Sequence, residues 1–410
     1  MKRKSVCIIF MAVIVFSLSV HPAKSEFSCE EGLQDSGSIY RICMPVDVDY
    51  NGRLVIWAHG FQDAGTPVEI PEDQLSFHGV SIPDIVTSLG FGFATNSYSK
   101  TGLAVLQGSE DIQDLVDIYK DVAGEPEKIY LVGASEGGII TALLVEQHPD
   151  TFHAGLSLCG PVGYFPFQIN YFGDARATFQ AFFPNLIPGD PFDPPQELVD
   201  NWFEFYENTV KAQVVDPSNR HRLNQWVKVA KLPFDADNYI ETVELSVQDV
   251  LRYSVINMND ARTTLGGFPF GNIWKWYSGS DNDILLNQMV PRRKADPDAL
   301  DEMKSKYNTQ GLLNHPLITM HTLRDQQVPY LHEVFYNLKT IYQGSFLRKH
   351  INIPIDRFGH CEFTQEEALL SFGLMLFYAG DLSVLSGVGS MLEGDALKAF
   401  ETLALKYKLP

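Results

Sequence analysis

The chain has 410 residues, of which 45% are hydrophobic, 12% aromatic and 20% charged. This composition is typical of a globular protein with a large core, and it argues against disordered and fibrous proteins. Its length fits one large domain with insertions or two smaller domains. The net charge of −20 argues against nucleic acid and against an anionic membrane surface as partners, because both would repel the chain.

The first 25 residues have the order of parts of a secretory signal peptide. Basic residues at positions 2–4 precede a mostly apolar run over 6–20, which is too short for an ordinary membrane span, and residues 23–25 (Ala-Lys-Ser) resemble a cleavage site. We expect a secreted or periplasmic mature chain that begins near Glu26, with a net charge of −24 after loss of four basic residues. An uncleaved anchor is the alternative. No later segment has about 18 consecutive apolar residues, so we expect no membrane span in the mature protein.

Export places the remaining cysteines in an oxidising compartment, where cysteines pair. Cys7 leaves with the signal peptide, and Cys29, Cys43, Cys159 and Cys361 remain. The first two flank a short polar loop, which suggests a disulfide across an N-terminal hairpin and leaves the other two as a second pair. Four cysteines allow three pairings, and two buried free thiols at positions 159 and 361 are a further alternative. No Cys-x-x-Cys motif is present, so we expect no structural zinc site.

Apolar runs typical of buried strands alternate with helical patterns along much of the chain. The predicted strands cover residues 54–58, 91–96, 128–132, 154–158, 317–321 and 350–355. The predicted helices cover residues 82–89, 109–122, 137–147, 330–342 and 365–378. Continuous apolar strands between helices predict a mostly parallel sheet that is covered on both faces.

Between about Gly163 and Asn314 the pattern becomes Pro-rich, aromatic and mainly helical. The insertion's aromatic side chains are expected mainly to form its own core, and some are expected to roof a pocket for an apolar or aromatic group. Within the tail, residues 392–409 predict an amphipathic helix without an assigned role. The predicted parts are a signal peptide (1–25), two parts of an α/β core (26–162 and 315–381), a helical insertion (163–314) and a C-terminal tail (382–410).

A Gly-x-Ser-x-Gly motif, from Gly133 through Ser135 to Gly137, lies between a predicted strand and a predicted helix. Such a turn exposes the serine hydroxyl at the C-terminal edge of the sheet. Gly133 and Gly137 lack the Cβ atoms that would collide in so sharp a turn. The helix N-terminus supplies free N–H groups and a positive partial charge. The five-residue motif alone occurs by chance in many proteins, where it can be a purely structural turn. Flanked by a strand and a helix, it predicts a nucleophile.

A serine at neutral pH needs a general base that a carboxylate orients. Asp325 follows the predicted strand 317–321, and His360 follows the last predicted strand and a glycine, so both are expected at the same sheet edge as Ser135. The chain order serine, aspartate, histidine is the one that this turn predicts. Asp356 is the rival acid, but it lies only four residues before His360, and the acid is expected from the neighbouring strand's loop.

Two backbone N–H donors are expected for the oxyanion that develops during acyl transfer. One is the N–H of Glu136, directly after the serine. The other is expected from the loop after the first long parallel strand, where the Phe61 N–H is the first choice and Gln62 the alternative. We expect His59 in this loop to brace it by hydrogen bonds rather than to act as the base.

The motif at Ser135, the His-Gly-Phe loop, Asp325 and the Gly-His pair at 360 together resemble the α/β-hydrolase superfamily over residues 50–160 and 315–380. The resemblance implies an α/β fold with an eight-stranded, mostly parallel sheet flanked by helices. It places the helical insertion in the lid position. It also implies cleavage of an ester, thioester or amide by a Ser-His-Asp triad without a cofactor.

The His360-Cys361 pair is also similar to the histidine–cysteine pair of tannase and fungal feruloyl esterases. In those enzymes the cysteine bonds to one directly before the nucleophilic serine. Ala134 occupies that place here, so the resemblance covers half of that signature. Cys159 is a substitute partner, because its predicted strand ends near the same sheet edge.

These patterns predict a secreted serine hydrolase that acts on a small-molecule ester with an apolar or aromatic group. A secreted serine peptidase of the same fold, similar to aminopeptidases, is one alternative, and a catalytically inactive binding protein on a hydrolase scaffold is another. No Gly-x-Gly-x-x-Gly or phosphate-binding loop is present, and the acidic stretch at 280–283 lacks the spacing of a calcium loop. We therefore expect no cofactor, no metal and no nucleic-acid partner, and the sequence leaves the oligomeric state open.

Overall fold

The computed structural model describes residues 26–77, 79–392, 394, 397–398 and 401–402. The strands are β1 (Phe27–Leu33), β2 (Ile39–Pro45), β3 (Arg53–Ala58), β4 (Ser76–Phe77), β5 (Val80–Ser81), β6 (Gly92–Asn96), β7 (Lys128–Ala134), β8 (Ala154–Leu158), β9 (Leu317–Arg324) and β10 (His350–Phe358). The predicted signal peptide lies outside the described residues, as does much of the predicted tail helix at 392–409.

The α-helices of the described part alternate with these strands and fill the long interval between β8 and β9. They are α1 (Ile82–Ser88), α2 (Val105–Ala123), α3 (Glu136–Gln147), α4 (Phe165–Phe182), α5 (Gln196–Asp200), α6 (Trp202–Phe205), α7 (Lys211–Val215), α8 (Arg220–Ala230), α9 (Tyr239–Ile256), α10 (Met258–Thr264), α11 (Asp283–Met289), α12 (Pro297–Lys306), α13 (Leu331–Tyr342), α14 (Gln365–Tyr378) and α15 (Leu382–Ser390). No helix among the described residues is long and apolar enough to cross a bilayer.

Eight strands form one sheet in the order β1-β2-β6-β3-β7-β8-β9-β10. The β1–β2 and β2–β6 pairs are antiparallel, and every later neighbour pair is parallel. The predicted eight-stranded, mostly parallel sheet is therefore confirmed. Cys29 and Cys43 face each other across the β1–β2 hairpin and form a disulfide, as their spacing suggested.

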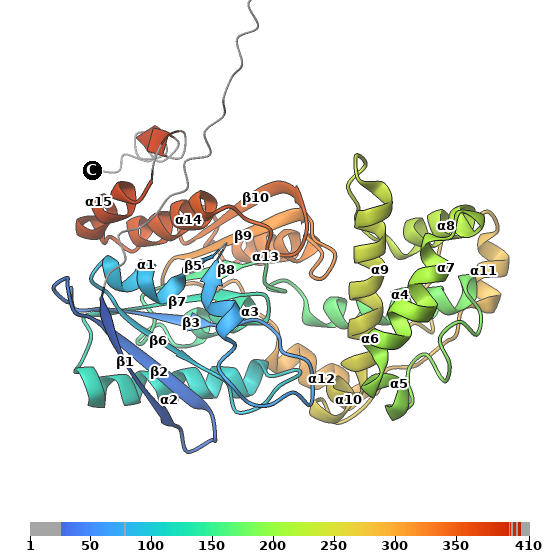
Figure 1. The fold of residues 1–410 in the computed structure, drawn as a ribbon, viewed down its shortest axis with the longest axis horizontal. Helices are drawn as coiled ribbons and strands as arrows, with labels where there is room; N and C mark the ends of the chain where they lie inside the picture. Colours follow the sequence, from blue (N-terminus) through green and yellow to red (C-terminus); the bar gives the residue numbers. More distant parts are fainter. Residues whose placement is uncertain (1–25, 78, 393, 395–396, 399–400, 403–410) are drawn as a thin grey trace, which may run out of the picture.

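Side chains alternate across the sheet, and helices cover both faces (Figure 1). From β3, Leu54 and Ile56 pack in one core with residues of α2 and α3. Val55 and Trp57 pack in a second core with residues of α1, α14 and α15 on the other face. Because a fully buried Leu or Ile contributes roughly 1.5–3 kcal/mol, this double cover explains why the central strands are apolar throughout rather than alternating.

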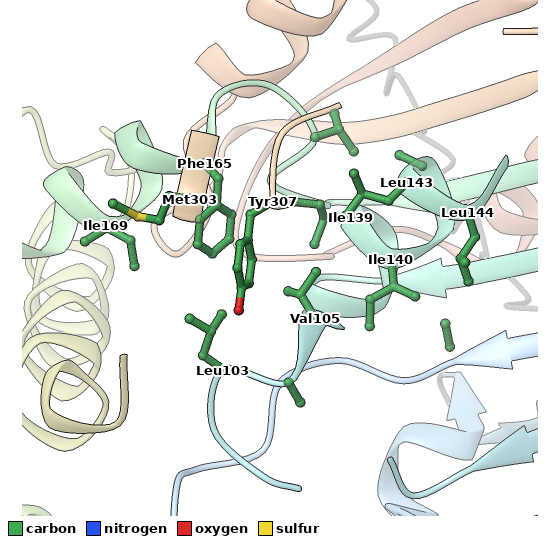
Figure 2. Packing of buried hydrophobic residues seen from close by; sticks show 14 of the residues in the cluster. Leu103, Val105, Ile139, Ile140, Leu143, Leu144, Phe165, Ile169, Met303 and Tyr307 are labelled. Atoms are coloured by element: carbon green, nitrogen blue, oxygen red, sulfur yellow. The ribbon is translucent and has the colours of Figure 1, made fainter. Parts of the chain in front are cut away.

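Residues 163–314 form α4 to α12, which lie beyond one edge of the sheet in Figure 1. Part of this segment has its own core, which includes Phe179, Trp202 and Trp226. Another part joins the core on the α2–α3 face: Figure 2 shows Phe165 and Tyr307 beside Ile139 of α3. The helical segment is thus packed onto the sheet, next to the strand ends that carry the site.

Candidate active site

Ser135 lies in the sharp turn between β7 and α3, with φ +56° and ψ −116°. A non-glycine residue in this backbone region costs on the order of 1–3 kcal/mol, so surrounding contacts must hold it. The Ser135 N–H donates to the Leu158 carbonyl at the end of β8 (2.8 Å). A Cβ atom on Gly133 would contact the Gly137 carbonyl, and one on Gly137 would contact the Ala58 carbonyl. The two glycines therefore permit the turn, as the motif predicted.

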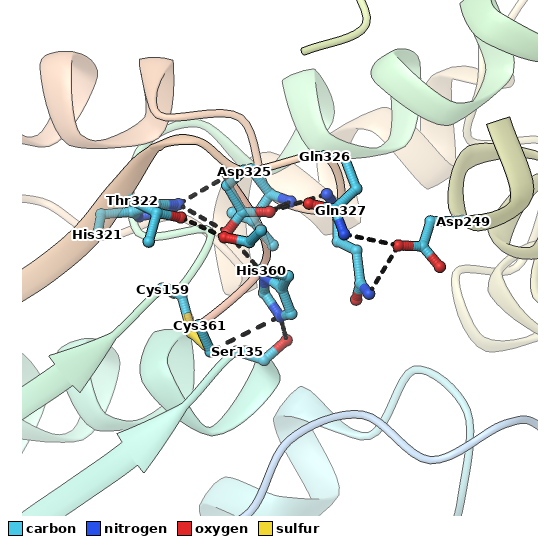
Figure 3. A network of polar contacts seen from close by, with 12 residues as sticks. Ser135, Cys159, Asp249, His321, Thr322, Asp325, Gln326, Gln327, His360 and Cys361 are labelled. Atoms are coloured by element: carbon cyan, nitrogen blue, oxygen red, sulfur yellow. Dashed lines mark hydrogen bonds and ion pairs between the residues drawn. A yellow bond between two sulfur atoms is a disulfide. The ribbon is translucent and has the colours of Figure 1, made fainter. Parts of the chain in front are cut away.

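The structure brings Ser135, Asp325 and His360 together at the carboxyl ends of β7, β9 and β10 in the parallel part of the sheet (Figure 3). His360 Nε2 lies 2.9 Å from Ser135 Oγ, and His360 Nδ1 lies 2.7 Å from Asp325 Oδ2. Both distances are within hydrogen-bond range. Asp325 directly follows β9, and His360 follows β10 after one glycine. Parallel strands end at the same sheet edge, which is why residues so far apart in the sequence meet.

Asp325 is fully buried, and both of its carboxylate oxygens are occupied. Oδ1 accepts hydrogen bonds from the Gln327 and Val328 N–H groups, each at 2.8 Å. Burial opposes ionisation, but the charge of His360 and a hydrogen bond from His321 outweigh it and lower the pKa of Asp325 to about 2. Asp325 is therefore a charged and rigidly held partner for the imidazole.

His321 is a second histidine at Asp325, and the sequence patterns did not predict it. Its buried ring places Nε2 2.8 Å from the Val328 carbonyl and 3.3 Å from Asp325 Oδ2, while Nδ1 lies 3.4 Å from Glu333 Oε1. Burial disfavours its charge, but the two carboxylates outweigh burial and raise the pKa of His321 to about 10. An imidazolium thus lies between two buried carboxylates. The one signal in the sequence is a histidine inside an otherwise apolar strand, four residues before Asp325.

Two rival residues are not part of this arrangement. Asp356 has an 80% exposed side chain, and its carboxylate faces Arg324 at 3.5 Å instead of His360. The His59 ring is buried, lies 2.7 Å from the Gly60 carbonyl through Nδ1 and stacks on Tyr98 with 3.8 Å between ring centroids. Burial lowers the pKa of His59 to about 4, so the ring is neutral and braces its loop.

The loop after β3 packs directly against the nucleophile turn. A Cβ on Gly60 would lie 3.3 Å from Ser135 Cβ, and the Gly60 N–H donates to Gln74 Oε1 (2.6 Å). Within the described part of the chain, the N–H groups of Phe61 and Glu136 donate to no other protein group. Both donors are free to bind an oxygen next to Ser135, so they stay the predicted oxyanion pair.

A disulfide joins Cys159, directly after β8, to Cys361, directly after His360. The Cys159 N–H also donates to the Met320 carbonyl in β9 (2.8 Å). The disulfide therefore ties the loop that carries the histidine, after β10, to the end of β8 on the other side of β9, whereas Ala134 before the serine takes no part. Cys159, His360 and Cys361 form a group of close potential metal ligands. Since the two sulfurs are bonded to each other, this group offers no thiolate.

Neither a protein-family model nor a curated protein matches this sequence. Among solved structures, the chain is similar to an acylaminoacyl peptidase from Pyrococcus horikoshii (11% identity, TM-score 0.41, 83% of this chain and 38% of that one). It is also similar to feruloyl esterase B from Aspergillus oryzae (11%, 0.48, 81% and 73%) and an esterase from Pyrococcus furiosus (10%, 0.40, 90% and 92%). The chain spans little more than a third of the peptidase's length.

The sheet, the turn after β7 and the loops after β9 and β10 have the arrangement that the sequence resemblance implied. Helices flank both faces of the sheet, and the nucleophile turn lies at its C-terminal edge between strand and helix. The chain therefore has the fold of the α/β-hydrolase superfamily.

Proposed function

We propose that the chain is an exported serine hydrolase that cleaves carboxylic esters through Ser135, His360 and Asp325. The observation that carries the proposal is the unbroken series of short contacts from Ser135 Oγ to His360 Nε2 (2.9 Å) and from His360 Nδ1 to Asp325 Oδ2 (2.7 Å). Such a series lets an imidazole remove the serine proton while the carboxylate holds the ring in the required tautomer.

In the first step, Ser135 Oγ attacks the ester carbonyl carbon while its proton passes to His360 Nε2. Asp325 accepts the Nδ1–H hydrogen bond throughout and stabilises the imidazolium that forms. The carbonyl oxygen gains the negative charge and binds the N–H groups of Phe61 and Glu136. The positive end of the α3 dipole lies at the same place and adds to this stabilisation.

In the second step, His360 gives its proton to the alcohol oxygen, the ester C–O bond breaks, and an acyl group stays on Ser135. Water then attacks the acyl carbon while His360 takes its proton. Collapse of the second tetrahedral intermediate releases the acid and returns the proton to Ser135 Oγ. Every proton is accounted for by His360, so this chemistry needs no cofactor.

The helical segment 163–314 is proposed to act as a lid over this site. Tyr253 of α9 donates to Gln327 Oε1 (2.9 Å), and Asp249 of the same helix accepts from the side chains of Gln326 and Gln327 (2.9 and 3.1 Å). These contacts attach α9 to the loop that carries Asp325. Phe165 and Tyr253 of the segment also line the hollow at Ser135, which supports a lid over an independent domain.

Export is supported by the two disulfides, Cys29–Cys43 and Cys159–Cys361. Such bonds persist in oxidising compartments and are rare in a reducing cytosol. The signal-peptide pattern of the first 25 residues points the same way. A secreted or periplasmic location is thus part of the proposal.

A serine aminopeptidase is the second candidate, because an acidic groove adjoins His360. Glu241, Asp249 and Glu362 line this groove, and a negative groove favours the charged amine of a peptide N-terminus. Turnover of aminoacyl-p-nitroanilides exceeding that of short-chain p-nitrophenyl esters would support the peptidase. We favour the esterase because the hollow directly at Ser135 is lined mainly by apolar side chains.

The direct test is the Ser135→Ala variant assayed on p-nitrophenyl butyrate. We expect turnover to decrease by about 10⁴-fold or more, because the nucleophile is lost while folding is retained. Ser305→Ala, an exposed serine of α12, is the matched control and should keep wild-type turnover. Unchanged turnover in Ser135→Ala would end the proposal.

A further inference from the structure

Ser135 lies at the end of a hollow on the α2–α3 face, which we call the Phe165 hollow. Its walls include Leu103, Val105, Ile139, Phe165 and Ile169, and its volume is about 700 Å³ with its open mouth counted. Figure 2 shows these five side chains close together in the core that joins α3 to the helical segment. The walls also contain Glu136, Gln168 and Asn257, so most but not all of the lining is apolar.

The same serine also borders a second hollow of about 850 Å³, which His360 and Cys361 line as well. Four residues of this hollow, Trp57, Phe77, Ile82 and Leu158, also line a further cavity of about 670 Å³. We call the two together the Trp57 channel. The two cavities adjoin along these four side chains, so together they extend from Ser135 toward the opposite core of the protein.

The inner part of the Trp57 channel runs between the sheet and helices α1 and α14. Val86 of α1 and Ala368, Leu369 and Phe372 of α14 form its walls there. Among the described residues, these walls carry no charged side chain, and Gln365 is the one polar residue there. Arg252 at the mouth is paired with Asp63 at 2.7 Å. A hydrocarbon chain fits such a lining, because its methylenes would exchange contacts with water for contacts with apolar side chains.

The position of His360 decides which half of an ester enters which cavity. The alcohol oxygen must lie within hydrogen-bond reach of His360 Nε2, because it receives its proton there. His360 lines the Trp57 channel and is not among the described residues that line the Phe165 hollow. His360 also lines the acidic groove, whose carboxyl groups do not suit an apolar chain. An apolar alcohol therefore leaves on the channel side, and the acyl group points into the Phe165 hollow.

We propose that the substrate is an ester with two apolar arms, whose alcohol chain occupies the Trp57 channel and whose acyl chain occupies the Phe165 hollow. This inference rests on the proposed function and adds the substrate class to it. Burial raises the pKa of Glu136 to about 8, so the Phe165 hollow holds a mostly neutral carboxyl group at pH 7 and stays compatible with an acyl chain.

Two series of esters measure the effect of the alcohol chain and the effect of the acyl chain separately. Alkyl acetates from ethyl to decyl lengthen only the alcohol, and ethyl alkanoates from acetate to decanoate lengthen only the acyl group. In the wild type, each methylene that enters an apolar cavity should increase kcat/KM by about fourfold until the cavity is full. A pH-stat measures both series without a chromophore that would itself fill a cavity.

Two substitutions fill one cavity each: Ala368→Trp in the Trp57 channel and Ala261→Phe in the Phe165 hollow. Ala368→Trp should lower kcat/KM for decyl acetate relative to that for ethyl acetate by at least about tenfold. The same variant should change kcat/KM for ethyl decanoate relative to that for ethyl acetate less than twofold. Ala261→Phe should do the reverse. Ala123→Trp, at the end of α2 and outside both cavities, is the matched control.

The assignment of the arms is overturned if Ala368→Trp selectively impairs the ethyl alkanoate series, or if neither filling variant changes either ratio. A thermal melt shows whether Ala368→Trp or Ala261→Phe fails to fold. In that case the smaller substitutions Ala368→Leu and Ala261→Leu are assayed instead. Partial filling should shorten the preferred chain of the matching series by a few methylenes.

A binding measurement separates this inference from the proposed function, because it needs no turnover. Calorimetry should show that 1-decanol binds the Ser135→Ala protein and that Ala368→Trp in the same background weakens binding at least about tenfold. Equal binding in the two proteins overturns the channel assignment even where esters are hydrolysed. If the wild type hydrolyses no ester but 1-decanol binds and Ala368→Trp weakens that binding, the proposed esterase activity is overturned while the channel assignment stands.

Discussion

Both carboxylate oxygens of Asp325 face N–H groups or a positively charged ring, which stabilises the charge that faces His360. Two backbone N–H groups hold Oδ1, while two histidines share Oδ2. A neutral amide of the same shape would present an N–H group to His360 and force the wrong tautomer. Asp325 is therefore required for its charge and for accepting the hydrogen bond from His360, and a side chain of the same shape would not replace it.

We expect Asp325→Asn to decrease turnover of p-nitrophenyl butyrate by about 10⁴-fold with little change in fold. Asp356→Asn is the matched control, since the exposed Asp356 carboxylate faces Arg324 and should be dispensable. Steady-state kinetics of the two variants show whether Asp325 or Asp356 is the carboxylate that His360 requires. A large loss in Asp356→Asn together with an active Asp325→Asn would contradict the assignment.

His321 predicts how stability depends on pH. Its pKa in the folded protein, about 10, lies above the ordinary value of 6.5, so its charge stabilises the fold fully below pH 6.5. This contribution is lost as the pH rises from 6.5 through 10. Asp325, Glu333, His332 and the Tyr330 ring face the group.

The melting temperature of His321→Gln should therefore lie furthest below that of the wild type at about pH 6, and the gap should narrow toward about pH 10. Scanning calorimetry across this range measures the gap directly. A gap that is constant or that widens with rising pH would show that His321 is not held in its charged form.

The sequence predicted Ser135, Asp325 and His360 because each follows a recognisable strand, so its sheet edge could be inferred from local patterns. His321, Glu333 and Gln74 could not be found in this way. Their roles depend on which side chains meet inside the fold, and a buried histidine in a strand looks the same in the sequence whether or not a carboxylate faces it.

At the scale of elements, the two disulfides close loops of very different length and position. Cys29 and Cys43 are 14 residues apart at one edge of the sheet, whereas Cys159 and Cys361 are 202 residues apart and adjoin the site. Cys159 follows Leu158, whose carbonyl accepts the Ser135 N–H, and Cys361 follows His360. The second bond thus connects the residue after Leu158 to the residue after His360, and we expect it to hold Ser135 and His360 at a fixed spacing.

Replacing both Cys159 and Cys361 by alanine should lower the free energy of unfolding by roughly 2–5 kcal/mol and also lower turnover. Replacing Cys29 and Cys43 should lower stability but leave turnover near that of the wild type. Denaturant unfolding and kinetics at a temperature where all proteins are folded give both quantities. Equal turnover in the two double variants would show that the bond beside His360 has no role in positioning.

Most helices and strands of the sheet were predicted within a few residues, because continuous apolar strands and amphipathic helices differ clearly in period. β1 and β2 are exceptions, because the cysteines there suggested a hairpin but no strand bounds were predicted. Another exception is α2, which begins at Val105, four residues before its predicted start. Its first turn packs Gly108 against Tyr98 and Ile140, a tertiary contact that the local pattern does not contain. Individual helices of residues 163–314 were not predicted either, since Pro and aromatic residues there give no regular period.

At the scale of the whole molecule, export and disulfide formation predict the number of free thiols. Loss of the first 25 residues removes Cys7, and the four other cysteines are paired. Thiol titration of the denatured, exported protein should therefore find no free thiol. One free thiol per chain would contradict cleavage before Glu26, and a larger number would contradict the disulfides.

Covalent labelling by a fluorophosphonate shows whether Ser135 is an activated nucleophile. Mass spectrometry should find one phosphonyl group per wild-type chain, on Ser135, and labelling should be lost in Ser135→Ala and strongly slowed in His360→Ala. A folded wild-type protein that stays unlabelled, or that carries the label on another serine, would contradict the claim.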